Sequence, residues 1–270
     1  MLFTIFGSSG FIGRNLVNYL KTNPEIELYT PDIRTVDITK KNLGHVIYAI
    51  GDLNYKKNTA NFIQSHVGHL NNILNNSNFD SLLYCSATRV YFGTENTHED
   101  ALLSLDSTKT NNLYPISKIM AELICLSFSN PKIKIVRLSN VSGFNHTSNL
   151  FLPSIIREAV DTKKITLHTK LESEKDYVHI DDVVKILPEI ILNGKYRIYN
   201  VASGQNTTNQ ALISKIQEIV PCELEVLENA TNYSFSEINT KRLVDEFNFQ
   251  PKSILNYIQD IVLSYKNLRM

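Results

Sequence analysis

The sequence predicts an α/β fold in which a doubly wound parallel sheet carries a smaller C-terminal lobe. Three observations lead to this prediction. The chain opens with a short apolar strand and a glycine-rich turn, and strand-like apolar runs then alternate with helical segments. From about residue 143 this alternation loosens, which indicates a second, smaller unit. A chain of 270 residues has room for both.

The first fourteen residues predict a phosphate-binding turn. An apolar run over residues 2–6 is followed by three glycines, and apolar residues then recur at helical spacing up to Leu20. Glycines permit the tight turn and the close approach of a pyrophosphate, and the helix N-terminus offers its N–H groups to the phosphates. We therefore expect a dinucleotide cofactor to be contacted by this turn, at Gly7, Ser9, Gly10, Phe11, Ile12 and Gly13.

The following segments indicate where other ligand contacts lie. Strands are expected at 27–30, 45–50, 81–86 and 133–138, and helices at 59–76 and 114–128. Ligands of such sheets bind beyond the carboxyl ends of the strands. This rule directs attention to Ala49 and Gly51, to Ser86 through Thr88, and to Ser139 through Ser142.

The second half predicts helices at 150–160, 181–192 and 207–219, strands at 164–168, 176–180 and 197–201, and a mostly helical tail over 237–268. We expect residues 1–142 to form a Rossmann-type cofactor-binding domain, with segments at about 176–202 returning to it. Residues 143–175 and 203–270 would then form a substrate-binding lobe.

The amino-acid composition further limits the classes of function that we expect. The 27 basic residues equal the 27 acidic ones, so nothing predicts general attraction to nucleic acid or to an anionic membrane. The three cysteines are scattered without metal-ligand spacing, as expected for a reduced, cytoplasmic protein without a metal. We see no signal peptide or membrane span in the sequence, and we expect a small-molecule substrate.

Tyr114 and Lys118 form the candidate catalytic pair. At positions i and i+4 of a predicted helix they lie on one face, one turn apart. For a tyrosine to act as a base near pH 7, its pKa must fall by about three from its usual value near 10, which corresponds to roughly 4 kcal/mol. An ammonium about 4 Å away at an effective dielectric of ~20 supplies about that much. An ordinary surface pair is the alternative interpretation of the same spacing.

Five segments, taken together, resemble the extended short-chain dehydrogenase/reductase family, the NAD(P)-dependent sugar-nucleotide epimerases, dehydratases and reductases. They occur in the family's order over roughly residues 1–205, and they are Gly7–Gly13, Cys85–Tyr91, Tyr114–Lys118, Arg137–Ser142 and Asp176–Asp182.

The resemblance implies a hydride mechanism. Tyr114 would exchange a proton with a sugar hydroxyl, typically at C4, and Lys118 would lower the tyrosine pKa and hold the nicotinamide ribose. Val141 would contact the cofactor, and Asn140 would lie near the sugar nucleotide. Lys175 stands where relatives often carry arginine, as a diphosphate or structural partner, although a solvated lysine is an equal alternative. His179, Asp181 and Asp182 would be structural rather than metal ligands.

Three departures from the family pattern affect the expected reaction. Ala87 occupies the position of the family's catalytic Ser/Thr, and Ser86 and Thr88 flank it as candidate substrate-binding and catalytic hydroxyls. Strand alternation turns these neighbours to the opposite face, although an irregular strand end would let Thr88 reach the substrate. Thr88-Arg89 replaces the acid pair of the 4,6-dehydratases, which argues against water elimination. The short segment between Tyr29 and His45 resembles the compact 4-keto-sugar reductases.

The choice between NAD and NADP stays open at the sequence level. Asp32 lies where an acid would accept from the ribose 2′-OH of NAD, and the nearby Arg34 could instead meet the 2′-phosphate of NADP. Asp37-Ile38 resembles the family's pair beside the adenine, and a turn-capping aspartate is the alternative.

We therefore expect an NAD(P)-dependent enzyme that epimerises or reduces a nucleotide sugar at C4. The alternative is a non-catalytic dinucleotide-binding sensor of the same fold, which Ala87 favours. A homodimer through the Tyr114 helix is compatible with the apolar residues on that helix, although core packing explains them equally well; they are Ile119, Leu123 and Leu126.

Overall fold

The centre of the protein is a six-stranded parallel sheet. The computed structural model describes residues 1–52 and 57–269. The sheet has the order β2-β1-β3-β4-β5-β9, and its neighbouring strands pair in parallel. Its strands are β1 (Leu2–Phe6), β2 (Glu27–Tyr29), β3 (His45–Tyr48), β4 (Ser81–Ala87), β5 (Ile133–Leu138) and β9 (Ile198–Val201). This arrangement confirms the predicted α/β fold class.

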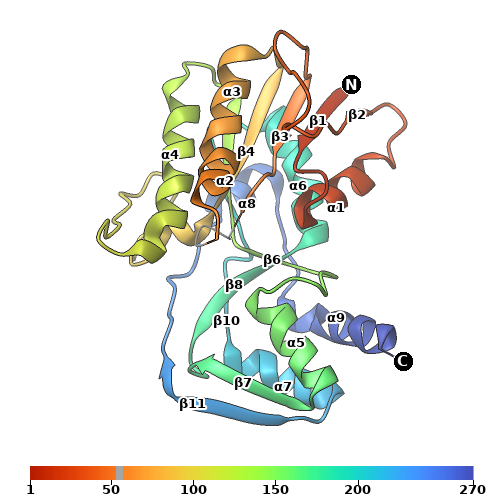
Figure 1. Cartoon of the computed structure of the whole chain (residues 1–270), viewed down its shortest axis with the longest axis vertical. Coiled ribbons are helices and arrows are strands. Elements are labelled where there is room, and N and C mark those ends of the chain that lie inside the picture. The colour runs from red at the N-terminus through yellow and green to blue at the C-terminus, as the bar shows by residue number, and fades with distance from the viewer. Residues whose placement is uncertain (53–56, 270) are drawn as a thin grey trace.

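Helices cover both faces of this sheet (Figure 1). Because successive side chains of a strand point to opposite faces, Phe3 and Ile5 pack with α1 (Phe11–Leu20) and α6 (Ile180–Asn193), whereas Phe6 packs on the other face. That second face is covered by α3 (His69–Asn76) and α4 (Leu113–Ser127). The expected helix over 59–76 is divided into α2 (Thr59–Ile63), a π-helical turn (Gln64–Gly68) and α3.

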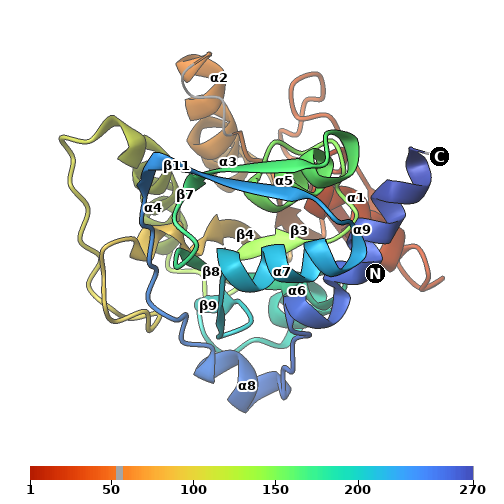
Figure 2. The same ribbon diagram turned by 90° about the horizontal axis from the view of Figure 1, so that it is seen from below.

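The remaining strands form two smaller sheets below the main one (Figure 1). β6 (Asn140–Ser142), β8 (Glu174–His179) and β10 (Asn206–Thr208) form one of them. β7 (Lys164–Thr169) and β11 (Glu223–Thr231) pair in parallel and form the other, as Figure 2 shows. The segment expected at 176–180 therefore lies in a small sheet, whereas α6 and β9 join the large one.

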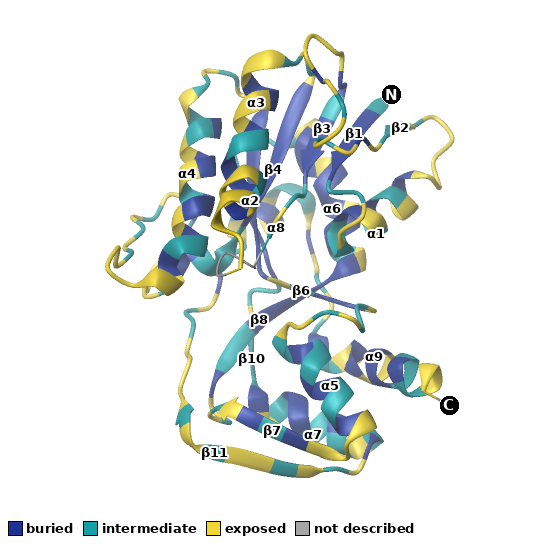
Figure 3. Ribbon diagram, in the orientation of Figure 1, coloured by how far each residue is buried: buried dark blue, intermediate teal, exposed yellow. Residues whose placement is uncertain are grey.

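A second apolar core holds the lower part of the molecule together. It is built from α5 (Phe151–Asp161), α7 (Asn209–Ile219) and α9 (Ile254–Leu268) with β7. The short helix α8 (Lys241–Phe247) instead lies against β9 (Figure 2). Figure 3 shows that the strands of the main sheet other than the edge strand β2 are largely buried, whereas β11 is largely exposed. None of the helices in the described part of the chain is long and apolar enough to cross a membrane.

Candidate active site

The glycine turn between β1 and α1 is too tight for any other residue at two of its positions. Gly7 has a φ of +88°, and a Cβ there would lie 2.8 Å from the carbonyl carbon of Ala49. A Cβ on Gly13 would lie 2.2 Å from the carbonyl oxygen of Gly7. Contacts under 3.0 Å force a backbone shift, so the turn requires glycine at both positions.

The end of this turn leaves a helix N-terminus open for an anion. Gly10 is the N-cap of α1 and has no side chain with which to cap it. The first-turn N–H groups and the positive end of the helix dipole are then available to a phosphate. The exposed Ser9 precedes this cap, and Phe11 and Ile12 are half-buried against the core of the main sheet. This geometry fits the diphosphate of a dinucleotide.

Other residues expected at the cofactor lie at neighbouring strand ends. Ala49 follows β3 and packs against Gly7, and the exposed Gly51 follows it. Val141 lies on β6, close to Gly143, where a Cβ would approach the ring of Phe11 within 3.3 Å. The structure thus brings the end of β6 near the glycine turn.

Asp32 and Arg34 bind each other. The Arg34 guanidinium donates to both carboxylate oxygens of Asp32, over 2.8 and 2.7 Å, and both side chains are exposed. The Arg34 side chain and N–H hold the pKa of the Asp32 carboxyl at about 2. The two side chains considered as contacts of the ribose, Asp32 and Arg34, are therefore bonded to each other in this structure.

Asp37 and Ile38 have local structural roles. The Asp37 carboxylate accepts the N–H of Thr39 over 2.8 Å, which is the turn-capping alternative considered for it. The Ile38 side chain is 2% exposed and packs in the core with Phe6 and Tyr48. The Ile38 side chain is therefore part of the core, and the expected contact of this residue with the adenine stays a prediction.

Tyr114 and Lys118 share the first turns of α4, and the ammonium of Lys118 is bonded to the neighbouring strand β4. Its Nζ donates to the carbonyl oxygen of Cys85 over 2.9 Å. The same atom lies 5.0 Å from the centre of the Tyr84 ring and 5.9 Å from that of Tyr114. Lys118 is 4% exposed, so this ammonium is buried at the carboxyl end of β4.

The pKa values of this pair correct one expectation. Burial raises the pKa of Tyr114 to about 12, and the charge that opposes this rise is that of Arg89. Burial lowers the pKa of Lys118 to about 8. The expected lowering of the tyrosine pKa by the lysine is absent because the ammonium is directed at Cys85 and the phenol is desolvated.

His66 supports this pair and was not singled out from the sequence. It lies on the π-helical turn, fully buried, with Nδ1 2.8 Å from the Ser117 hydroxyl and Nε2 2.9 Å from the carbonyl oxygen of Asp52. Ser117 donates to the carbonyl oxygen of Tyr114, and the His66 ring meets the Tyr114 ring edge-on at 5.5 Å. In the sequence, the signal for this role of His66 was a histidine among the apolar positions of a predicted helix.

A buried ion pair below the site was also missed. Arg137 on β5 donates to the Glu122 carboxylate over 2.7 Å, and the two side chains are 4% and 3% exposed. Ser86 donates to the same carboxylate over 2.5 Å. The Ser86 hydroxyl is therefore bonded to Glu122 in this structure, and its expected contact with the substrate stays a prediction. Arg137 is a basic residue between the apolar Val136 and Leu138 at the end of a strand, and this was its sequence signal.

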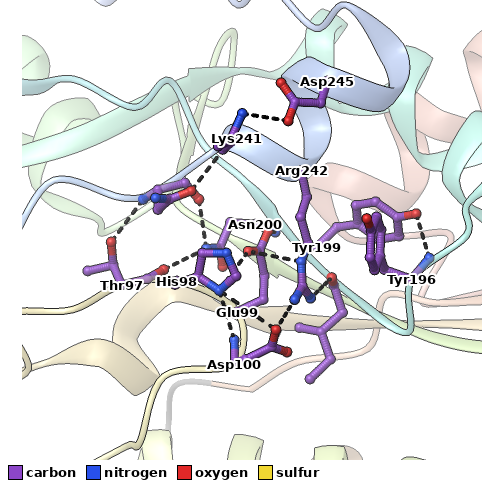
Figure 4. A network of polar contacts seen from close by, with 12 residues as sticks. Thr97, His98, Glu99, Asp100, Tyr196, Tyr199, Asn200, Lys241, Arg242 and Asp245 are labelled. Carbon is purple, nitrogen blue, oxygen red and sulfur yellow. Dashed lines mark hydrogen bonds and ion pairs between the residues drawn. The ribbon is translucent and has the colours of Figure 1, made fainter.

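Further polar contacts fix the segment that leads from β4 to α4 (Figure 4). Arg137 also donates to the Tyr91 hydroxyl over 2.6 Å, which in turn donates to Asn200 on β9. The N–H of Asn200 donates to the buried carboxylate of Glu99, which also forms an ion pair with Arg242 of α8. These contacts hold residues 97–100 against β9 and α8.

Ala87 and Thr88 lie where β4 ends. Ala87 is the last residue of the strand, and Thr88 begins a short 3-10 turn (Thr88–Tyr91). Both residues are half-buried. The irregular strand end on which the Thr88 hypothesis depends is therefore present.

The expected substrate contacts Asn140 and Lys175 line one cavity. It has a volume of about 110 Å³ and is bounded by β6, β8 and α5. Val141 also lines it, and Asn140 donates to the carbonyl oxygen of Asp176 over 2.7 Å. Lys175 lies 4.7 Å above the Phe151 ring, and burial lowers its pKa.

His179, Asp181 and Asp182 serve the start of α6. The Nδ1 atom of His179 accepts the N–H of Asp181, which caps the helix. The Asp182 carboxylate accepts the N–H of Lys252 over 2.9 Å. Over residues 1–52 and 57–269, no group of histidine, cysteine and acidic side chains has the arrangement of a metal site.

Comparison with known proteins identifies the family. The NAD dependent epimerase/dehydratase family matches residues 68–202, half of the chain, and the chain belongs to this family. A curated relative, GDP-6-deoxy-D-talose 4-dehydrogenase from Aggregatibacter actinomycetemcomitans, is 24% identical over 85% of this chain and 83% of its own length.

Solved structures share the whole fold. RMD from Pseudomonas aeruginosa, complexed with NADPH, superposes with a TM-score of 0.82 at 20% identity, over 98% of this chain and 99% of its own. UDP-glucuronic acid 4-epimerase from Bacillus cereus, complexed with UDP-glucuronic acid and NAD, superposes with a TM-score of 0.84 at 15% identity, over 100% of both chains. The cofactors of these two structures agree with the expected NAD or NADP.

Proposed function

We propose that this protein transfers hydride between NAD(P) and C4 of a nucleotide-activated sugar, either as a 4-epimerase or as a 4-keto-sugar reductase. The observation that carries the proposal is the position of Tyr114, one helical turn from the buried Lys118. The Lys118 ammonium is bonded to Cys85 near the carboxyl end of β4, and the glycine turn, which follows β1, packs against Ala49 just after β3. Ligands of parallel sheets bind at this edge.

Different residues of the chain would bind the cofactor and the sugar nucleotide. The glycine turn and the N-terminus of α1 would hold the cofactor diphosphate, and Lys118 would hold the nicotinamide ribose. The nicotinamide supplies the hydride acceptor or donor when it is bound. Asn140 and Lys175, which line the cavity beside β8, would bind the sugar nucleotide. Thr88 would hydrogen-bond the sugar, since Ala87 has no hydroxyl.

Tyr114 would move the proton. With a pKa of about 12 it is a neutral phenol at pH 7, so it can donate its proton to the oxygen of a 4-keto sugar. Removing a proton from a C4 hydroxyl would require the tyrosine pKa to fall first, through a positive charge brought close to its oxygen. The raised pKa therefore supports the reductase over the epimerase.

The test is a Tyr114→Phe variant, with the exposed Tyr196→Phe variant as its control. We expect Tyr114→Phe to bind NADH or NADPH like the wild type, measured by nicotinamide fluorescence, and to lose turnover by at least about 100-fold. Turnover retained in Tyr114→Phe would remove this residue from the mechanism. Cofactor that stays bound through turnover indicates an epimerase, whereas exchangeable NADPH indicates a reductase.

Ala87 favours one second candidate, a non-catalytic dinucleotide-binding sensor. The missing hydroxyl at this position and the lysine directed at Cys85 both weaken a catalytic arrangement. Exchangeable cofactor without activity on any nucleotide sugar would support the sensor.

We also propose that two copies pair through α4. Of the three apolar residues noted on this helix, Leu123 is 61% exposed, while Ile119 and Leu126 are partly buried against the cores. Leu123 shares an open groove with Ile116 and Met120. A Leu123→Arg variant is expected to shift a dimer to a monomer in sedimentation, and a wild type that sediments as a monomer would contradict the pairing.

A further inference from the structure

The hydroxyl of Tyr91 anchors the short turn that follows β4. Tyr91 is the last residue of the 3-10 turn (Thr88–Tyr91) and is 3% exposed. Its hydroxyl accepts a hydrogen bond from the Arg137 guanidinium over 2.6 Å and donates one to the Asn200 side chain over 2.9 Å. Arg137 lies on β5 and Asn200 on β9, which are both strands of the main sheet. The last residue of the turn is therefore bonded to the sheet.

The two partners of this hydroxyl are themselves held by other bonds. Arg137 is paired with the buried carboxylate of Glu122 on α4. Asn200 is fully buried, and its amide donates to the carbonyl oxygens of Thr97 and Asn239, each over 2.8 Å. Since neither partner is free to follow a movement of the turn, the Tyr91 hydroxyl has one position in which both of its hydrogen bonds form.

The accessible part of the chain at the end of β4 is three residues long and lies between fixed points. Ala87 ends β4 and pairs with Leu138 of β5, and Val90 is fully buried. Residues 87–89 are half-buried, and α4, which carries Tyr114, packs against the turn. Thr88 supplies the side-chain hydroxyl of this accessible stretch.

We propose that Tyr91 is a positioning residue, and that its hydroxyl holds the turn so that Thr88 can hydrogen-bond the sugar. This inference rests on the proposed function, which gives Thr88 that contact. A displacement of about 1 Å in a group that acts on the substrate can cost a large factor in rate, and buried hydrogen bonds behind such a group prevent the displacement. Tyr91 is three residues after Thr88, so the loss of its hydroxyl would release the turn on one side.

The experiment is a double-mutant cycle in Thr88 and Tyr91. Turnover is measured with dTDP-4-keto-6-deoxyglucose and GDP-4-keto-6-deoxymannose in the presence of NADPH, and with UDP-glucose in the presence of NAD+. The sugar that the wild type converts with the highest kcat/KM is then used for the variants. We expect Tyr91→Phe to lower kcat/KM for this sugar by at least about fivefold and to leave the KM for the cofactor unchanged.

The cycle tests whether Tyr91 acts through Thr88. Thr88→Val alone should lower kcat/KM by more than Tyr91→Phe does, because it removes the hydroxyl itself. In the Thr88→Val background, Tyr91→Phe should lower kcat/KM by less than about twofold, since the group that it positions is already absent.

Tyr199→Phe is the matched control. Tyr199 is fully buried, and its hydroxyl also has one charged and one neutral partner, since it donates to Glu246 over 2.7 Å and accepts the N–H of Tyr196 over 2.9 Å. It precedes Asn200 on β9 and therefore points to the opposite face of the sheet. Both variants should lower the midpoint of urea unfolding to a similar extent, but Tyr199→Phe should keep the wild-type kcat/KM. A role of Tyr91 in stability alone predicts the same turnover for both.

Arg137→Lys is the second variant, in case Tyr91→Phe does not fold. Lysine keeps a charge for Glu122 but lacks the planar guanidinium that reaches both Glu122 and the Tyr91 hydroxyl. Cofactor affinity, measured by nicotinamide fluorescence, reports whether each variant is folded. If Tyr91→Phe is misfolded, Arg137→Lys takes its place in the cycle, with the same expected factors.

Three results would overturn the inference. Wild-type kcat/KM in a folded Tyr91→Phe would show that the hydroxyl does not position a group that acts on the substrate. An equal loss of kcat/KM with and without the Thr88 hydroxyl would show that Tyr91 acts through another group. Both results leave the proposed function intact. Binding of the cofactor without turnover of any of the three nucleotide sugars would instead refute the proposed function, and the inference with it.

Discussion

The buried ammonium of Lys118 makes the stability of the protein depend on pH in a way that one substitution should remove. Burial lowers the Lys118 pKa from an ordinary 10.5 to about 8. Between these two pH values the unfolded chain holds the proton and the folded chain has released it. Stability increases with pH wherever the unfolded state binds more protons. The wild type should therefore gain stability relative to Lys118→Met as the pH rises from 8 to 10.5.

The size of this effect follows from the pKa shift. Each pKa unit corresponds to about 1.4 kcal/mol, so the difference in free energy of unfolding should grow by about 3 kcal/mol across the window. Other groups titrate here as well. Burial raises the pKa of the Cys85 and Cys125 thiols to about 12, which weakens the fold above pH 9. The Cys125 contribution is common to wild type and variant and cancels in the difference, whereas that of Cys85 cancels in part, because the Lys118 charge lowers the Cys85 pKa in the wild type.

Urea unfolding at pH 7, 8, 9 and 10, without added nucleotide, measures the difference directly. Lys185→Met provides the control, because Lys185 is an exposed lysine on α6 and its removal changes the net charge equally. The free energy of unfolding of Lys185→Met, plotted against pH, should run parallel to that of the wild type. If the Lys118→Met curve is parallel as well, the ammonium is not desolvated and the geometry derived for the Tyr114 pair is wrong.

Three further predictions concern the surroundings of the site. Glu122→Leu leaves the buried Arg137 guanidinium uncompensated and should lower the free energy of unfolding in urea by about 3–5 kcal/mol; a loss under about 1 kcal/mol would contradict the buried pair. Asp32→Asn releases Arg34, so the affinity for NADPH relative to NADH should rise by up to about fivefold in fluorescence titrations, and an unchanged ratio would show that Arg34 does not face the 2′-phosphate. His66→Phe removes the partner of a serine hydroxyl on α4 and should cost about 1–3 kcal/mol at pH 7. Because burial lowers the His66 pKa to about 4, the wild type loses stability as the pH falls from 6.5 toward 4, and the variant should lose less over that range.

Most strands of the main sheet could be predicted because they are buried on both faces. β1, β4 and β5 read as nearly continuous apolar runs, which is the pattern of parallel strands between two layers of helices. The glycine turn was predictable for a related reason. Gly7 and Gly13 have no room for a Cβ, so the backbone geometry itself demands glycine.

Strands held by distant partners could not be predicted in this way. β11 (Glu223–Thr231) is mostly exposed and carries three glutamates, so its sequence shows no apolar run. It is a strand because its backbone pairs with β7, more than fifty residues earlier in the chain. β6 and β10 have three residues each, too few to show a period.

The site shows the same division between local and distant causes. Helical spacing predicts that Tyr114 and Lys118 are neighbours, and the structure has them one turn apart. It does not predict the direction of the ammonium, because the acceptor that fixes it is the carbonyl oxygen of Cys85 at the end of β4. It does not predict the charge of the phenol either, because that depends on burial and on Arg89, which lies on a turn that the helix pattern does not include. A Tyr-x-x-x-Lys motif therefore identifies the two groups, whereas the packing at the end of β4 sets the pKa of each.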